Sequence, residues 1–209
     1  MAIRIVFISD THGLHGKIKV PDGDILVHAG DITMDGDLEV LADFNRWLGA
    51  LPHQHKVIIA GNHDFCFENR NKASRDILTN ATYLQDESAV VAGIKFHGSP
   101  WQPWFFDWAF NLPRGPKLKA KWNLIPSGTD ILVTHGGPMH ILDRTQRGED
   151  VGCADLADAV RRIKPRVHVF GHIHEAYGTK TIEDTLFINP SSCNADYAPA
   201  NKPVAHEWK

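Results

Sequence analysis

The chain has 209 residues, of which 43% are hydrophobic and 22% are charged, and this composition is typical of one globular domain spanning residues 1–209. A formal net charge of -3 at pH 7 provides no broad basic surface, so strong nucleic-acid binding is not expected. No apolar run approaches the roughly 20 residues of a membrane span, and the N-terminus lacks the zones of a signal peptide. The three scattered cysteines fit reduced thiols better than a disulfide framework. We therefore expect a cytoplasmic protein without membrane attachment.

Strands and a helix alternate in the first third of the chain. The apolar run Ile3–Ile8 predicts a strand that is covered on both faces, and residues 25–28 predict a second strand. From Asp37 to Gly49, leucines recur at helical spacing and predict an amphipathic helix, after which residues 57–60 predict a third strand. A strand, a helix and a strand in this order indicate a right-handed crossover and a parallel sheet.

The pattern changes in the second half. Residues 89–97 predict a hairpin around Gly93, and therefore antiparallel pairing in another part of the sheet system. Residues 101–110 combine tryptophan, phenylalanine and proline without a period, which predicts a long loop or a broken helix. The remaining expected elements are a helix near 74–78, a strand at Ile131–Thr134, a helix at 156–163, a strand at 167–170 and a last strand at 186–188.

Five of the predicted strands end in polar clusters. Because the carboxyl ends of strands form the ligand crevice of α/β sheets, we expect these clusters to converge. Imidazole and carboxylate ligands suit manganese, iron, zinc, cobalt or nickel better than magnesium or calcium. The donors exceed the needs of one ion, and a two-metal site requires a bridging carboxylate. The clusters are Asp10 with His12, Asp31, Asn62 with His63, His135, and His172 with His174.

The last of these clusters has two interpretations on its own. If the strand at 167–170 continued, His172 and His174 would share one face and could bind a single metal ion. Alternatively, they are two exposed histidines in a turn. Chelation is favoured only because the other strand ends supply matching acids and histidines.

The order of motifs Asp-x-His, Gly-Asp, Gly-Asn-His-Asp, His-Gly and Gly-His-x-His resembles the calcineurin-like metallophosphoesterases, from Ile3 to about Asn189. The resemblance implies an α/β fold in which two mixed sheets pack as a sandwich flanked by helices. It implies one metal held by Asp10, His12 and His174, a second held by Asn62, His135 and His172, and Asp31 bridging the two. His63 would then be a catalytic donor to a phosphoryl oxygen or to the leaving group, oriented by Asp64.

Details of the motifs indicate which branch of the family the chain resembles. Asp31 is followed by Ile32 and Thr33 without the arginine of phosphoprotein phosphatases, and Asp64 stands where those enzymes have glutamate. The segments around Pro100, Arg114 and Pro138 are similar to the small MPPED-type branch, which resembles the class III cyclic nucleotide phosphodiesterases more distantly. Some vertebrate members of that branch have glycine at the place of His172, so the histidine here predicts a complete binuclear centre.

This branch implies a metal-dependent phosphodiesterase that hydrolyses cyclic nucleotides and chromogenic diesters with loose specificity. Two divalent transition-metal ions, with manganese as the first choice, would share a hydroxide that attacks phosphorus in line. The expected partner is a small phosphodiester or nucleotide. The alternatives are a phosphomonoesterase or small nuclease with the same metals, and a non-catalytic scaffold.

Several side chains are candidates for substrate contact. Trp101, Trp104 or Phe105 could stack on a nucleobase, and we expect one of these rings to border the pocket. Most of them are expected to fill a core beneath the loop, and an exposed homodimer patch is a third alternative. His97, His140 and Arg144 are further candidates for substrate binding, against the alternative that they are structural or solvated. Three other groups are expected to play no part in the chemistry: Cys66 as a packed thiol, His168 as a buried strand residue, and His53, His55 and His206 as surface histidines.

Overall fold

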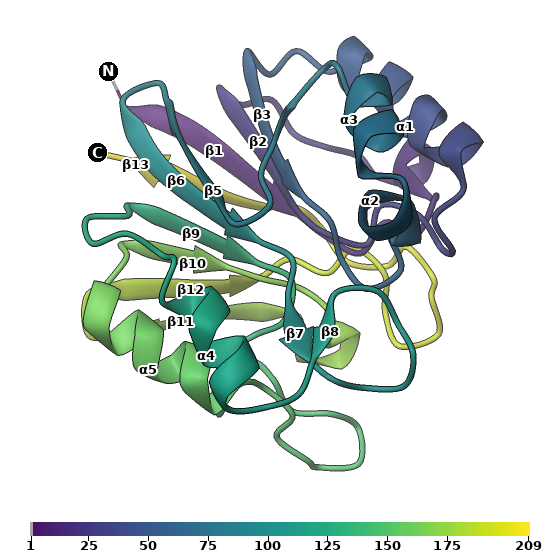
Figure 1. Ribbon diagram of the computed structural model, residues 1–209. Coiled ribbons are helices and arrows are strands. Elements are labelled where there is room, and N and C mark those ends of the chain that lie inside the picture. The colour runs from purple at the N-terminus through teal and green to yellow at the C-terminus, as the bar shows by residue number, and fades with distance from the viewer. Residues whose placement is uncertain (1) are drawn as a thin grey trace.

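Two β-sheets pack face to face between two layers of helices in the computed structural model, which describes residues 2–209 (Figure 1). The first sheet has the order β13-β1-β2-β3-β4, and β1 to β4 are parallel to their neighbours. Strand β13 is antiparallel to β1, with Ile3 opposite Trp208. The strands are β1 (Ile3–Ile8), β2 (Ile25–Ala29), β3 (His55–Ile59), β4 (Thr82–Tyr83) and β13 (Val204–Trp208).

The second sheet has the order β11-β12-β10-β9-β6-β5, with four parallel strands in its centre and an antiparallel strand at each edge. A separate pair of short strands, β7 (Gln102–Pro103) and β8 (Asn111–Leu112), lies outside both sheets. The strands of the second sheet are β5 (Glu87–Val91), β6 (Ile94–Ser99), β9 (Ile131–Thr134), β10 (Val167–Val169), β11 (Gly178–Ile182) and β12 (Thr185–Asn189).

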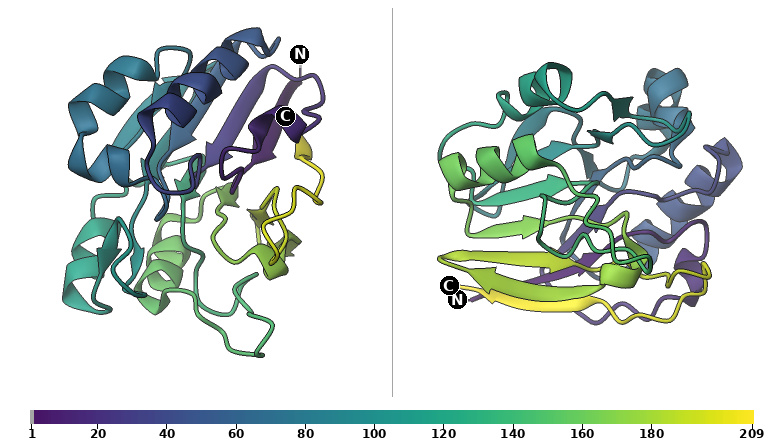
Figure 2. Two further views of the ribbon diagram at one scale, coloured as in Figure 1. Left: turned by 90° about the vertical axis from the view of Figure 1, so that its right-hand side faces the viewer. Right: turned by 90° about the horizontal axis from the view of Figure 1, so that it is seen from below.

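Helices cover the outer face of each sheet. On the first sheet lie α1 (Leu38–Ala50), α2 (Phe65–Asn69) and α3 (Asn71–Ile77), and on the second lie α4 (Pro116–Trp122) and α5 (Ala154–Ile163) (Figures 1 and 2). Because strand side chains alternate, Ile5 and Phe7 enter the core between the sheets while Val6 and Ile8 pack beneath the helices. Two short 3-10 helices, η1 (His15–Lys17) and η2 (His174–Ala176), complete the elements.

The predicted α/β sandwich flanked by helices is confirmed, and so are most of its elements. Asp37 caps α1, since its side chain accepts hydrogen bonds from the N–H groups of Glu39 and Val40. The hairpin around Gly93 forms as β5 and β6. The helix predicted near 74–78 is α3, which begins earlier, at Asn71.

Two predictions about the periphery are wrong. Strand β12 is not the last strand, because β13 follows it and adds an edge to the first sheet. His53 is buried rather than on the surface, since its ring packs near Gly23, whereas His55 and His206 are half-buried. His168 is fully buried and Cys66, Cys153 and Cys193 are buried free thiols, as expected. No helix within residues 2–209 is long and apolar enough to cross a bilayer.

Candidate metal centre

The seven predicted metal ligands follow strands of both sheets. Asp10 and His12 follow β1, Asp31 follows β2 and Asn62 follows β3, all in the first sheet. His135 follows β9, and His172 and His174 follow β10, in the second sheet. The carboxyl ends of the parallel strands therefore meet at one edge of the sandwich, as expected from the strand order.

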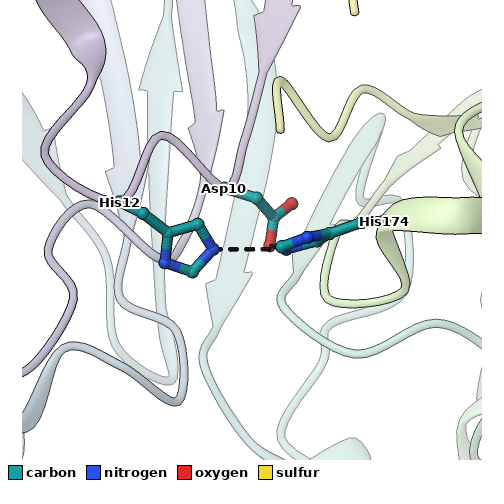
Figure 3. A group of neighbouring side chains, drawn as sticks. All are labelled: Asp10, His12 and His174. Atoms are coloured by element: carbon teal, nitrogen blue, oxygen red, sulfur yellow. Dashed lines mark hydrogen bonds and ion pairs between the residues drawn. The ribbon is translucent and has the colours of Figure 1, made fainter. Parts of the chain in front are cut away.

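Asp10, His12 and His174 form the first group of donors (Figure 3). The Nε2 atoms of His12 and His174 are 3.2 Å apart, and His174 Nε2 is 3.4 Å from Asp10 Oδ1. The other nitrogen of His174, Nδ1, lies 3.0 Å from the carbonyl oxygen of Asn194, which orients the ring. Hydroxyl groups of Ser9 and Ser191 donate to Asp10 Oδ2 and leave Oδ1 toward the group.

Asn62, His135 and His172 form the second group. The side-chain oxygen of Asn62 lies 2.8 Å from His135 Nε2 and 2.7 Å from His172 Nδ1. Asp31 stands between the two groups, because its Oδ2 is 3.3 Å from His135 Nε2 and 3.8 Å from His12 Nε2. This position suits a bridging carboxylate, and the division of the seven donors between two ions stays a prediction.

The turn after β10 separates its two histidines. Strand β10 ends at Val169, and His172 has a left-handed backbone with φ of 71°, so the interpretation that the strand continues is wrong. His172 reaches Asn62, whereas His174 begins η2 and reaches Asp10 and His12. The backbone N–H of His172 also donates to Asp10 Oδ1 at 3.0 Å, which ties this turn to the end of β1.

Charges in the centre favour a bound cation. Burial lowers the pKa of His12 to about 4 and the pKa of His172 to about 3, so both rings are neutral and can offer lone pairs. Burial alone would lower the pKa of His135, but the neighbouring Asp31 carboxylate raises it to about 9. Burial opposes ionisation of Asp31 too, yet the charge of His135 holds the Asp31 pKa below its usual range.

The donor set fits divalent transition metals. His135 Nδ1 lies 2.9 Å from the carbonyl oxygen of Ala29 and donates to it, so Nε2 is left facing the oxygens of Asn62 and Asp31. In the metal-free protein, a proton on Nε2 holds these acceptors together, and a divalent cation can replace that proton. Imidazole nitrogens with carboxylate oxygens are the ligands that manganese, iron, zinc, cobalt and nickel accept.

A cavity of about 340 Å³ opens from the donors. Asp31, Asn62, His63, His172 and His174 line it, and so do several aromatic side chains. Its other lining residues are Pro103, Trp104, Phe105, Trp108, Arg114, Gly136, Gly137, Thr145, Val151, Gly152, Ile173, Glu175 and Tyr197.

Comparison with known proteins identifies the family. The model of the calcineurin-like phosphoesterase family matches residues 3–176. The chain belongs to the calcineurin-like phosphoesterases. It is 44% identical to metallophosphoesterase domain-containing protein 1 of Homo sapiens over 226 residues, a match that covers 96% of this chain and 69% of the relative. UPF0046 protein T07D4.2 of Caenorhabditis elegans is 40% identical, with 97% of this chain and 59% of that protein covered.

Solved structures share the fold of this phosphoesterase. The protein TT1561 of Thermus thermophilus aligns with a TM-score of 0.64 and 14% identity, covering 99% of each chain. Together with the clustered histidines and aspartates, family membership makes this protein a metal-dependent phosphoesterase with a divalent metal centre. The predicted resemblance, including its MPPED-type branch, is confirmed.

His63 and Asp64 lie at the candidate metal centre, but Asp64 does not orient the His63 ring directly. The ring Nδ1 of His63 is 2.7 Å from the carbonyl oxygen of Met34, and its backbone N–H donates to Asp31 Oδ1. The Asp64 carboxylate instead accepts hydrogen bonds from the backbone N–H groups of Ile32, Thr33 and Gly61. Asp64 therefore fixes the two strand-end loops that carry Asp31 and His63, which corrects the predicted contact. Burial, followed by the charge of Asp31, raises the pKa of Asp64 to about 6.

Four of the six candidate substrate contacts, His97, Trp101, His140 and Arg144, do not line the cavity. His97 is buried with its Nδ1 2.8 Å from Ser88 Oγ, and Trp101 donates its indole N–H to Asp86 at 2.9 Å. His140 pairs with Asp150, and Arg144 is exposed beside the same turn, where its backbone forms a bridge to Asp150. Side-chain partners therefore hold His97, Trp101 and His140 outside the cavity lining, and Arg144 faces solvent.

The other two candidates line the cavity, together with residues that the sequence did not single out. Trp104 and Phe105 line the cavity and are 60% and 57% exposed, so the prediction that one ring of this segment borders the pocket is confirmed for these two. Trp108 packs on His63 with ring centroids 4.2 Å apart. Tyr197 and Arg114 were missed, since neither lies next to a polar strand end in the sequence.

Proposed function

We propose that this phosphoesterase is a phosphodiesterase that acts on nucleotide-like diesters such as cyclic nucleotides. The observation that supports this most directly is that three aromatic side chains, Trp104, Phe105 and Trp108, line the same cavity as the metal-ligand groups. A cavity of about 340 Å³ has room for an organic group as well as the phosphoryl group. Aromatic faces accept any nucleobase by stacking, which suits loose specificity.

The charge of the cavity also favours a diester over a monoester. A phosphomonoester carries close to two negative charges at neutral pH and calls for additional cations. Among the residues that line the cavity in the described chain, Arg114 is the one arginine or lysine, and its guanidinium already donates to the carbonyl oxygens of Gly152 and Val151 at 2.6 and 2.7 Å. A singly charged diester needs no cation beyond the two metal ions, and it therefore matches a cavity in which the one arginine is already engaged.

The residues present define how catalysis would proceed. Asp10, His12, Asp31 and His174 would hold one divalent ion, and Asp31, Asn62, His135 and His172 the other, with manganese as the first choice. Such ions lower the pKa of bound water and neutralise charge on a phosphoryl group.

His63 supplies the proton chemistry of the protein. Its Nδ1 is engaged by the carbonyl oxygen of Met34, so Nε2 is the nitrogen available to the cavity that the ring lines. Because Nδ1 keeps its own proton on the carbonyl oxygen of Met34, His63 would act as the doubly protonated imidazolium, whose Nε2 proton passes to the oxygen of the leaving alcohol and leaves the neutral ring. The packing of Trp108 on the ring keeps His63 in this orientation.

The decisive assay compares bis(p-nitrophenyl) phosphate with p-nitrophenyl phosphate, with and without manganese. We expect manganese-dependent turnover that favours the diester, and two metal ions per chain after loading. The matched control is Asp31→Ala, which removes the bridging carboxylate and should abolish turnover of both compounds. A preference for the monoester would assign the protein to the phosphomonoesterases, and absence of turnover after loading would indicate a scaffold. One ion per chain, with His172 free, would contradict the binuclear centre.

A further inference from the structure

Tyr197 reaches the metal centre from the C-terminal part of the chain, beyond residue 176, where the match to the family ends. Its ring packs edge-on against His12 and His174, at centroid distances of 4.8 and 5.1 Å, and lies 6.0 Å from the ring of His63. The side chain lines the cavity and is 42% exposed. It therefore stands beside both the first donor group and the proposed proton donor.

The backbone around Tyr197 fixes the position of this ring. Tyr197 has φ of 58°, a left-handed conformation that bulky residues rarely adopt and that often marks functional sites. Asn194 holds the turn, because its side-chain oxygen accepts the N–H groups of Asp196 and Ala198, both at 3.0 Å. The carbonyl oxygen of Asn194 accepts the N–H of Tyr197 at 2.9 Å and also contacts His174 Nδ1 at 3.0 Å. One residue thus orients both a metal ligand and Tyr197.

The hydroxyl group of Tyr197 differs from those of the other tyrosines. Tyr83 donates to Gln85 and Tyr177 donates to the carbonyl oxygen of Lys202, each at 2.9 Å. Within residues 2–209, no comparable hydrogen bond engages the hydroxyl group of Tyr197. A phenol at the wall of a cavity with its donor unused is available to a ligand.

We propose that Tyr197 is a further catalytic residue whose hydroxyl group donates a hydrogen bond to a phosphoryl oxygen of the bound ester. The proposal rests on the phosphoesterase activity of this centre and deepens the proposed function. A fixed donor at this position stabilises the negative charge that develops on the phosphoryl oxygens in the transition state. The hydroxyl group keeps its proton throughout, and no covalent bond to Tyr197 forms.

Tyr197→Phe tests the proposal, because it keeps the ring against His12 and His174 and removes only the hydroxyl group. We expect kcat/KM for bis(p-nitrophenyl) phosphate to fall at least about 10-fold, toward the roughly 100- to 1000-fold that loss of a donor to a developing oxyanion costs. The manganese content should stay at the wild-type value. Inorganic phosphate, used as a probe of the ground state, should bind the loaded variant more weakly in calorimetry. The matched control is Tyr177→Phe, which removes a hydroxyl group that already has a protein partner and should leave kcat/KM unchanged.

Two outcomes overturn the proposal. In the first, Tyr197→Phe retains more than half of the wild-type kcat/KM while Tyr197→Ala loses activity, which would mean that only the packing of the ring matters. In the second, Tyr197→Phe loses manganese, so that the hydroxyl group acts on the metal centre instead of the ester. If the wild-type protein prefers the monoester, only the proposal of a diester substrate fails. The ratio of kcat/KM between Tyr197→Phe and the wild-type protein is then measured on p-nitrophenyl phosphate. If neither ester turns over, unchanged phosphate affinity in Tyr197→Phe overturns the contact.

Discussion

Four of the seven predicted metal ligands hold a backbone conformation that side chains other than glycine rarely adopt. The φ angles are 51° at Asp10, 43° at His12, 59° at Asp31 and 71° at His172. A left-handed residue with a Cβ atom costs roughly 1–2 kcal/mol relative to a right-handed one. The strand ends therefore carry strain, which aims donors from tight turns toward a common point.

The strain at His172 leads to a prediction that separates stability from metal binding. Both His172→Gly and His172→Ala should lose the second metal while the ion at Asp10, His12 and His174 is retained. In the metal-free state, His172→Gly should be more stable than His172→Ala by about 1 kcal/mol, because glycine adopts φ of 71° without strain and loses part of that gain to chain entropy.

Urea unfolding of both variants in excess chelator checks the order of stability, and elemental analysis after manganese loading checks the metal content. Equal stability of the two variants would show that the turn relaxes when the histidine is absent. Loss of both ions in either variant would contradict the independence of the two donor groups.

Gly171 is held close to Asp10 for a steric reason. A Cβ atom at this position would overlap with Asp10 Oδ2 and would lie 2.6 Å from Ser9 Oγ. Gly171→Ala should therefore displace the Asp10 carboxylate, weaken manganese binding at the first donor group by 10-fold or more, and destabilise the protein by about 1–3 kcal/mol.

Titration of the metal-free protein with manganese, followed by calorimetry, measures this effect. The matched control is Gly16→Ala in η1, where a Cβ atom would meet nothing within 4 Å. Manganese affinity in Gly171→Ala equal to that in Gly16→Ala would rule out the steric account.

For single residues, the sequence predicted which side chains come together at the metal centre but not which contacts orient each of them. The polar clusters were recognisable because each follows an apolar run and adjoins glycine. The contact of His63 with Met34 was not recognisable, because a backbone carbonyl oxygen leaves no trace in residue identity. The place of Tyr197 could not be predicted either. It depends on a turn that is stabilised by Asn194, 20 residues after His174 in the chain.

At the scale of elements, the segment between β7 and β8 decides what the cavity offers to a substrate. Its backbone is fixed: the N–H of Gln102 donates to Phe110 and that of Trp104 to Leu112, while the Asn111 side chain donates to the carbonyl oxygens of Phe105 and Phe106. Because hydrogen bonds hold the backbone of this segment, its exposed rings can stack on a substrate without further ordering of the chain. This limits the entropy cost of binding.

We predict that Trp104→Ala lowers kcat/KM for thymidine 5′-p-nitrophenyl phosphate about 5-fold or more relative to methyl p-nitrophenyl phosphate. The two esters share a leaving group, so the ratio isolates the nucleoside, and base stacking is worth about 1–3 kcal/mol. Phe106→Ala is the matched control, because this ring is 65% exposed in the same segment but does not line the cavity. An unchanged ratio in Trp104→Ala would exclude stacking on this ring.

Elements with a clear period were predictable, whereas this segment was not. Helix α1 shows its apolar stripe and its cap in the sequence. Residues 101–110 show several aromatic rings and no period, so tertiary partners decide their roles. Asp86 and Lys121 hold Trp101 away from the cavity, with Lys121 4.2 Å from the centre of the Trp101 ring. The edge strand β13 was missed for a similar reason, because half-buried residues at a sheet edge give a weak pattern.

At the scale of the whole molecule, the donors join the two sheets. Asp10, Asp31 and Asn62 belong to strand ends of the first sheet, while His135 and His172 belong to the second. A bound ion therefore links layers that otherwise adhere mainly through the apolar core between them. Metal that binds only the folded protein stabilises it by about 2.7 kcal/mol when its free concentration is 100 times the dissociation constant.

Removal of metal should consequently lower Tm by about 5–10 °C at neutral pH. The gap between loaded and chelated protein should widen from pH 6.5 to pH 9. The metal-free protein gains stability from the protonated His135, whose pKa the Asp31 carboxylate raises to about 9 against the pull of burial. This contribution is complete below the unfolded pKa of about 6.5 and is lost as the pH rises toward 9. The proton on His135 also competes with the metal ion for the ring nitrogen. A rising pH therefore destabilises the metal-free protein and strengthens metal binding, and both effects widen the gap in Tm.

Calorimetric scans at several pH values, with manganese or with chelator, measure the gap directly. His135→Gln is the control, since it removes the titrating group and should flatten the pH dependence of the chelated protein. A gap that narrows with rising pH would contradict the assigned proton.

The pairing of β1 with β13 has a practical consequence. Ile3 lies opposite Trp208, so the two ends of the chain are neighbours (Figure 2), at the end of β1 that is remote from Asp10. A short linker could join residues 209 and 2, and the chain could be reopened at the exposed turn of Glu183 and Asp184 between β11 and β12. Such a circular permutant would carry its new termini, and any tag or surface attachment fused to them, away from the cavity. Retention of wild-type manganese content by the permutant would verify that the site depends on how the strands are arranged and not on the order in which they are connected.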